Sequence, residues 1–343
     1  MKIKMIKSAC IGLLFLAVTT SLSGAASLTA GARDLVKNAG DSSVVKGTDG
    51  WFFLKEELVH VGSGKFWGEE AAAVSRTSKK QFADPLPAIL EYNKLLSERG
   101  IDLYFMPVPP KALVYPDKLG AGIDGDGSIE QVAMYEEFYT LLRAGGVKVV
   151  DLLPVLLAKK KESDLYCKTD THFSADGIAL FADAAAAAIK KADWYSGVAK
   201  KEYLQSAKTL GIHGDLAEMA GLKDLNEPIE LSFVTVKETG KQEVSDPGSP
   251  VILLGDSHTL VFSAGGDLHA KGAGLFDHLS ADLGFPVDLL GVRGSGVTPA
   301  RIKLYQRAKK DGDYLKGKKA VIWCFTARDF TGSGGWREIP VAP

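Results

Sequence analysis

The sequence predicts an α/β fold, in which helices flank a largely parallel central sheet. Short apolar runs that suit buried strands recur at 101–106, 147–150, 251–254, 287–292 and 320–325. Segments with the apolar spacing of helices separate several of these runs. Strands that alternate with helices favour a parallel sheet covered on both faces, whose strands are continuously apolar.

Composition and charge limit the classes of function. The chain has 343 residues, of which 46% are hydrophobic and 24% charged, with a formal net charge of −1. These values are ordinary for a globular protein of one large domain or two small ones. A nucleic-acid-binding protein usually carries a basic excess, so we expect no nucleic-acid partner.

The first 26 residues are predicted to be a secretory signal peptide and not part of the fold. Lys2, Lys4 and Lys7 precede an apolar run from Ala9 to Val18, and small residues at 23–26 suit cleavage. That run is shorter than the roughly 20 residues that span a bilayer. An uncleaved membrane anchor is the alternative. Removing three lysines from a net charge of −1 leaves −4, so an anionic polymer would find no global attraction.

The first elements follow a polar lead-in at residues 27–46 without a clear pattern. Turn residues at 47–50 precede an aromatic strand at 51–54, and 62–68 reads as loop. A helix is predicted over 85–98, because Pro85 suits the first turn and Gly100 the end.

The strand at 101–106 is predicted to end at the proline-rich run 107–111, since proline cannot donate to a ladder. A helix from Ser128 to the glycines at 145–146 and the strand 147–150 form the next unit. A further helix is expected at 152–161.

Ser174 can cap an alanine-rich helix that extends to about residue 191. Residues 192–248 do not continue the alternation of strands and helices, and we interpret them as an insertion within a single domain, 27–343. Alternating apolar residues at 229–234 predict an edge hairpin there. A helix at 299–310 separates the last two strands.

Ser257 is the predicted nucleophile. It follows the apolar run 251–254 and Gly255, at the edge of the sheet where a side chain is presented to a cleft. We expect Gly255 to permit a sharp turn. The alternative is that Gly255-Asp256-Ser257 is only a turn.

Asp170 and His172 are the predicted partners of that serine. Residues i and i+2 of an extended segment point the same way, so Asp170 could hold the imidazole that takes the serine's proton. The alternative is a helix start with Asp170 and Ser174 as caps and an exposed histidine. We expect no metal and no cofactor, because no third metal ligand lies nearby in sequence.

Three further residues are candidates for binding the oxyanion or the substrate: Arg293, Gly255 and His258. Acyl transfer needs donors for the developing charge, and the backbone N–H of Ser257 is one candidate. Arg293 follows a strand and should reach the same edge, although a surface arginine is equally consistent. His258 is more plausible as a residue lining the cleft than as the base.

Two cysteines remain after signal cleavage, Cys167 and Cys324. Export permits a disulfide, but two cysteines alone do not establish a pairing. We expect two buried free thiols, with a Cys167–Cys324 bridge as the alternative.

Five segments carry a resemblance to a known family: 47–54, 107–111, 166–177, 255–257 and 293–296. Together they are similar to the alginate O-acetyltransferases AlgJ and AlgX, exported proteins with an SGNH hydrolase-like fold. Asp-Thr-His before Gly-Asp-Ser is the specific part, because ordinary SGNH hydrolases have the opposite order. Phe173 and Ser174 depart from the family's Trp-Thr, and the layout is closer to AlgJ than to AlgX, whose carbohydrate-binding module is not seen here.

The resemblance implies that Ser257 takes an acetyl group, His172 is the base, Asp170 orients it and Arg293 belongs to the site. It implies a periplasmic enzyme, either released or held at the inner membrane, that acetylates hydroxyls of an exported polysaccharide. The implied partners are a membrane-bound O-acyltransferase as acetyl donor and other exopolysaccharide-export proteins. An acetyl-esterase of the same fold and a non-catalytic polysaccharide-binding scaffold are the alternatives.

Overall fold

A computed structural model of the chain describes residues 26–343 except 121 and 124–127. The predicted signal peptide therefore lies almost wholly outside the described residues. Within them, no helix is both long enough and apolar enough to cross a membrane. The α-helices of the described residues are α1 Leu28–Asn38, α2 Lys55–Val61, α3 Ala71–Val74, α4 Pro85–Ser97, α5 Lys111–Val114, α6 Ser128–Ala144, α7 Leu153–Lys159, α8 Ala175–Ile189, α9 Asp215–Met219, α10 Leu275–Leu283 and α11 Thr298–Lys310.

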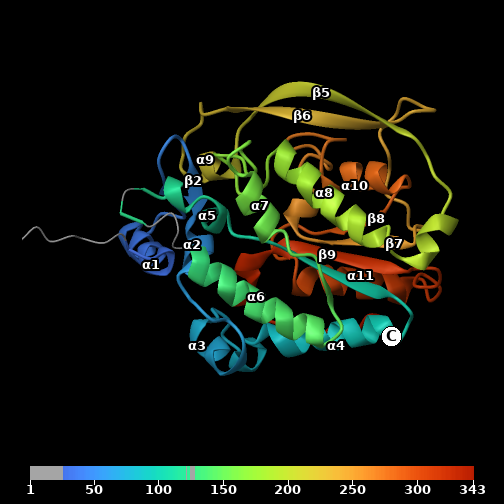
Figure 1. Cartoon of the computed structure of the whole chain (residues 1–343), viewed down its shortest axis with the longest axis horizontal. Coiled ribbons are helices and arrows are strands. Elements are labelled where there is room, and N and C mark those ends of the chain that lie inside the picture. Colours follow the sequence, from blue (N-terminus) through green and yellow to red (C-terminus); the bar gives the residue numbers. More distant parts are fainter. Residues whose placement is uncertain (1–25, 121, 124–127) are drawn as a thin grey trace, which may run out of the picture.

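The central sheet contains five parallel strands in the order β4-β3-β9-β7-β8. Figure 1 shows it crossing the molecule between two groups of helices. Its strands are β3 Asp102–Val108, β4 Lys148–Val149, β7 Val251–Gly255, β8 Asp288–Gly291 and β9 Ala320–Thr326. The predicted α/β class, its parallel sheet and its flanking helices are confirmed.

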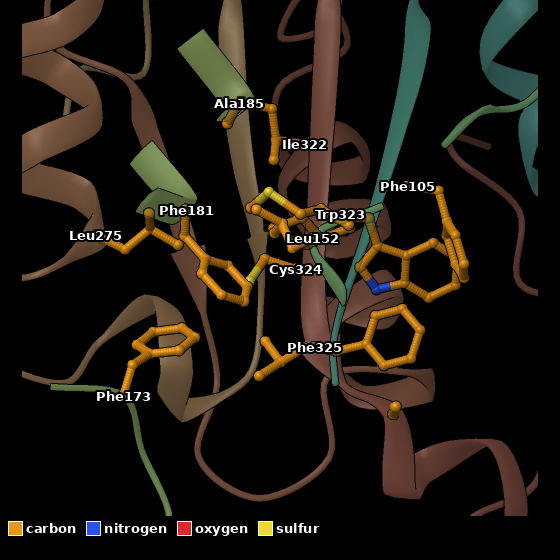
Figure 2. Packing of buried hydrophobic residues seen from close by; sticks show 14 of the residues in the cluster. Phe105, Leu152, Phe173, Phe181, Ala185, Leu275, Ile322, Trp323, Cys324 and Phe325 are labelled. Carbon is orange, nitrogen blue, oxygen red and sulfur yellow. The ribbon is translucent and has the colours of Figure 1, made fainter. Parts of the chain in front are cut away.

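The strand β9 divides the core into two layers, because successive side chains of a strand point to opposite faces. Figure 2 shows Ile322 and Cys324 on the face covered by α8 and α10, and Trp323 and Phe325 on the other face beside Phe105. Trp323 also packs against Tyr92 of α4 and lies under Arg301 of α11. All residues of β9 are buried, as a central parallel strand requires.

Two small antiparallel sheets lie outside the central one. The strands β1 Val44–Lys46 and β2 Phe52–Leu54 form the first, and β5 Tyr203–Ile212 and β6 Glu227–Val236 form the second. The prediction of an edge hairpin is therefore wrong in its placement, because β5 and β6 pair only with each other. Figure 1 shows this hairpin over the ends of α8 and α9. The lead-in at 27–46 was also misread, since it contains α1 and β1.

The proline-rich run does not end β3 where predicted. The strand continues through Pro107, which lies opposite Phe325 of β9. Phe105 faces β4, since its carbonyl accepts the N–H of Val150, and Pro107 two residues later faces the same side. Because β4 has ended there, the missing proline N–H costs no ladder bond.

Candidate active site

The turn after β7 presents Ser257. All of β7 is buried, and Ser257 begins a short 3₁₀ turn to Thr259. Asp256 caps this turn, because one of its carboxylate oxygens accepts a hydrogen bond from the N–H of His258 at 2.9 Å. The other oxygen accepts from the N–H of Thr326 at 2.7 Å. Ser257 is therefore held between β7 and the end of β9, with its side chain partly exposed.

Gly255 is needed for close packing and not for a left-handed turn. A Cβ at this position would lie 1.7 Å from the carbonyl oxygen of Cys324 in β9. Only glycine lets the two strand ends approach so closely. Among the described residues, Gly255 has no contact that supports its predicted part in oxyanion or substrate binding, which stays a prediction.

The segment that carries the other two residues is a series of bends after α7, not the extended segment predicted. Asp170 Oδ1 accepts from the backbone N–H of His172 at 2.9 Å and lies 2.6 Å from its Nδ1. The Asp side chain thus closes the turn and orients the imidazole at the same time. On the far side of the ring, Nε2 lies 2.7 Å from Ser257 Oγ.

These distances form a Ser-His-Asp arrangement from residues 85 positions apart in sequence. The imidazole has a hydroxyl on one nitrogen and a carboxylate on the other, which is the geometry of an activated serine nucleophile. The structure thus brings together Ser257, His172 and Asp170, as the sequence predicts. Their catalytic roles remain a proposal.

The charges around His172 suit a general base. Burial opposes its protonated form, but the Asp170 carboxylate outweighs burial, helped by Asp215 and Asp256, and raises the pKa of His172 above its ordinary value. Burial likewise disfavours ionised Asp170. The charge and hydrogen bond of His172, with a further hydrogen bond from His269, nevertheless hold the pKa of Asp170 well below its usual range. The pair therefore favours a carboxylate beside a readily protonated imidazole.

The second oxygen of Asp170 has two partners that the sequence did not reveal. It accepts from the backbone N–H of Asp215 at 2.9 Å and lies 3.0 Å from Nε2 of His269. His269 lies 99 residues from Asp170, and the sequence analysis does not identify it as part of the site. Its backbone is left-handed, with φ of 71°, which is unusual for a residue with a Cβ and is often found at functional sites.

The segment 192–248 also contacts the bends around Asp170. The carboxylate of Asp215 accepts from the N–H and hydroxyl of Thr171 at 2.7 and 2.5 Å. That of Glu227 in β6 accepts from the N–H groups of Lys168 and Thr169, each at 2.8 Å. Gly214, just before Asp215, is the sequence feature that reflects this contact. A Cβ at this position would lie 2.1 Å from the carbonyl oxygen of Thr169, so only glycine allows the two segments to pack so closely.

The structure does not place His258 in a cleft. It is 1% exposed, its Nδ1 lies 3.0 Å from Asp256 Oδ1, and its ring lies 4.7 Å from that of His172. The prediction that it lines the cleft is therefore wrong, because the 3₁₀ turn directs this neighbour of Ser257 into the core. Burial is the main cause that lowers the pKa of His258.

Arg293 lies in an exposed ion pair with Asp267, and the distance from its Nη2 to Asp267 Oδ1 is 2.6 Å. The loop that carries Asp267 also carries His269, so Arg293 is tied to the surroundings of Asp170 through that loop. No contact with Ser257 or His172 is found for Arg293 within the described residues. Its predicted role at the oxyanion or substrate stays a prediction.

The structure also tests the alternative of a disulfide between the two cysteines. Cys167 and Cys324 are both free and buried, so the alternative of a disulfide is wrong.

Asp170, His172 and Asp215 offer atoms within 4.8 Å of one another, close enough for a metal ion. However, Asp170 already accepts hydrogen bonds on both oxygens, and the Nδ1 of His172 is directed at one of them. This donor set suits a proton-transfer triad better than a metal site.

The comparisons with known proteins concern the family and the fold. Residues 44–327 match the family model of the SGNH hydrolase-like domain, acetyltransferase AlgX. The probable alginate O-acetylase AlgJ of Pseudomonas syringae is 27% identical over 188 residues, 55% of this chain and 44% of that protein. AlgJ of Pseudomonas aeruginosa is 28% identical over 152 residues, 44% of this chain and 34% of that one. The chain thus spans half or less of the length of these relatives.

Two solved structures share the fold. The O-acetyltransferase domain of Pseudomonas putida AlgJ superposes with a TM-score of 0.61 at 21% identity, over 84% of this chain and 92% of that one. Pseudomonas aeruginosa AlgX gives 0.60 at 18% identity, over 84% and 63%. The family match covers most of the chain, and with the shared fold it leads to one conclusion. The chain belongs to the family of SGNH hydrolase-like acetyltransferase domains that includes AlgX.

Proposed function

We propose that this protein is an O-acetyltransferase that moves an acetyl group to a hydroxyl of an exported polysaccharide through an acetyl-Ser257 intermediate. The observation that carries the proposal is the distance of 2.7 Å between His172 Nε2 and Ser257 Oγ, with Asp170 behind the ring. The names of the relatives, alginate O-acetylases, support a polysaccharide as the acceptor.

In the first half of the reaction, neutral His172 takes the proton of Ser257 as its oxygen attacks the carbonyl carbon of the acetyl donor. Asp170 stabilises the imidazolium that forms. The oxyanion collapses, the bond to the donor's leaving group breaks, and His172 returns the proton to that group. Acetyl-Ser257 and neutral His172 remain.

In the second half, a sugar hydroxyl replaces the donor. His172 takes the hydroxyl proton, the sugar oxygen attacks the acetyl carbonyl, and the proton passes to Ser257 Oγ as the ester bond to the serine breaks. Water in place of the sugar would give acetyl-ester hydrolysis by the same residues. The acceptor therefore decides between transferase and esterase.

Location and partners follow the same proposal. The predicted signal peptide supports a periplasmic enzyme, released or held at the inner membrane. A membrane-bound O-acyltransferase would supply the acetyl group, and other exopolysaccharide-export proteins would surround the enzyme. A covalent intermediate suits such a relay, because one protein can load the serine and another substrate can unload it.

The test is mass spectrometry after incubation with an activated acetyl ester. We expect a 42 Da addition, the mass of an acetyl group less one proton, on the peptide containing Ser257 and none in Ser257→Ala. Added oligosaccharide should discharge the adduct and become acetylated. Discharge at a rate that oligosaccharide leaves unchanged would identify an esterase. A wild-type protein that never acquires the adduct, with a polymer fully acetylated in Ser257→Ala cells, would identify a scaffold.

A further inference from the structure

Lys111, the last residue of the proline-rich run, is a buried cation beneath the bends around Asp170. It begins α5 and is 2% exposed. Its ammonium donates to three backbone carbonyls, those of Phe52 (2.7 Å), Lys168 (2.9 Å) and Asp170 (3.1 Å). Three donors meet three acceptors, so each ammonium proton has a partner.

No carboxylate lies within 4.0 Å of this ammonium in the part of the chain that the structure describes. The titratable groups that face it at longer range are Glu57 of α2, Cys167 and Asp170 of the bends, and Glu227 of β6. The rings of Trp51 and Phe53 lie 5.2 and 5.4 Å away. A buried charge is costly, so a lysine here needs a reason that an apolar side chain of similar length would not satisfy.

The reason lies in the carbonyls that it binds. Lys168 and Asp170 flank Thr169, and the carbonyl of Asp170 belongs to the residue whose side chain orients His172. Phe52 N–H donates to Lys168 O at 2.9 Å, so β2, Lys111 and the bends form one hydrogen-bonded unit. Without the ammonium, the carbonyl of Asp170 would lose the partner that fixes its peptide plane.

We propose that Lys111 is a positioning residue for the reaction, whose ammonium sets the backbone turn that presents Asp170 and His172 to Ser257. The inference rests on the proposed function. Lys111 touches no reacting atom and acts through Asp170.

Lys318 offers a matched control. It too is a buried lysine, 3% exposed, and it donates to the carbonyls of Pro247 (2.7 Å) and Ser249 (2.9 Å) and to the Asp288 carboxylate (2.9 Å). It lies before β9, at the end of the sheet opposite Ser257. Substitution of either lysine removes a buried cation, but of the two only Lys111 binds the bends around Asp170.

The first experiment compares Lys111→Met with Lys318→Met, using hydrolysis of an acetyl ester by full-length protein. We expect Lys111→Met to lower kcat about 100-fold with KM within about threefold, since small displacements of a catalytic group are that costly. The Lys318→Met protein should have a lower melting temperature than the wild-type protein but keep its kcat within about threefold of the wild-type value. A Lys111→Met protein with the kcat of the Lys318→Met protein would overturn the inference.

The second experiment uses pH, which a purely structural role would not move. Burial lowers the pKa of Lys111 to about 8. The neutral amine donates two protons and not three, so the wild-type rate should fall as pH rises through this region. Lys111→Arg cannot lose its charge and should not show that fall. An unchanged alkaline limb in Lys111→Arg would contradict the inference.

A fluorophosphonate probe separates this inference from the proposed function. It labels a serine that a histidine activates, without any acetyl chemistry. If the wild-type protein forms no acetyl-Ser257, the proposed function fails. Slower labelling of Ser257 in Lys111→Met than in Lys318→Met would still support positioning, and equal labelling rates would reject it.

Discussion

Two Asp-X-His turns meet at the edge of the sheet where Ser257 lies, and they have almost the same local geometry. In Asp170-Thr171-His172 and in Asp256-Ser257-His258, the aspartate accepts from the histidine N–H at 2.9 Å. The same oxygen lies 2.6 and 3.0 Å from the respective Nδ1 atoms. Each aspartate also binds a distant backbone N–H with its second oxygen, from Asp215 and Thr326 respectively.

The surroundings distinguish the turn at Asp170, which we propose to be catalytic, from the turn at Asp256. Carboxylates face His172 and raise its pKa despite burial, whereas burial, His172 and Arg328 lower the pKa of His258 despite Asp256. The Nε2 of His172 meets Ser257 Oγ. The two turns are therefore alike in their local hydrogen bonds, and the charges brought by other segments distinguish the two imidazoles.

The largest expected effect separates the two histidines. His172→Ala should lower kcat by at least about 10⁴-fold, as loss of a triad member does. His258→Ala should keep kcat within about tenfold but lower the free energy of unfolding by about 2 kcal/mol, because it empties a buried site. Ester kinetics and thermal melts decide, and a His258→Ala enzyme as inactive as His172→Ala would break the comparison.

The next effect concerns the aspartate. Asp170→Asn keeps the shape of the turn but not the charge, and should lower kcat about 10⁴-fold through the wrong imidazole tautomer. Far-UV circular dichroism should stay unchanged. A fall of less than tenfold would mean that Asp170 only closes the turn.

A smaller effect concerns pH. Because the folded pKa of His172 is raised, kcat/KM should be lost as pH falls through a value above its ordinary 6.5. Asp215 adds to this rise, so Asp215→Asn should move the acid limb to lower pH. The pH profile of ester hydrolysis measures the shift. An acid limb at the same or higher pH in Asp215→Asn would show that Asp215 does not act on His172 by charge.

The smallest effect concerns the hairpin. Glu227→Gln replaces a carboxylate that accepts three hydrogen bonds from Lys168 and Thr169, and should lower the free energy of unfolding by about 1–2 kcal/mol. We expect kcat to fall less than tenfold. Glu230, exposed on the same strand, serves as the control, and equal melting of the two variants would remove Glu227 from the support of the turn.

Much of the fold could be predicted, because strands such as 251–254 and 320–325 are continuous apolar runs between clear turn signals. The lead-in was misread because α1 has few buried residues, namely Leu28, Gly31 and Ala32, and owes its place to tertiary contacts. The end of β3 was predicted too early because the effect of Pro107 depends on where the neighbouring strand β4 ends, which the local sequence does not show.

For the site, the Asp-X-His and Gly-Asp-Ser patterns sufficed to find the triad residues, since each is a short local turn. His269 could not be found in this way. The acid nearest to it in sequence, Asp267, pairs instead with Arg293, and only the folded loop brings His269 to Asp170. Asp215 and Glu227 were hidden for the same reason, inside a segment that looked like an insertion.

The hairpin region contacts the bends around Asp170 through two acidic side chains, Asp215 and Glu227. A graft of this region from one relative to another, made to change which polymer is modified, would therefore also exchange the supports of the active centre. Designers of such chimeras would need to retain these two acids, or expect a protein that has the new surface and has lost its catalyst.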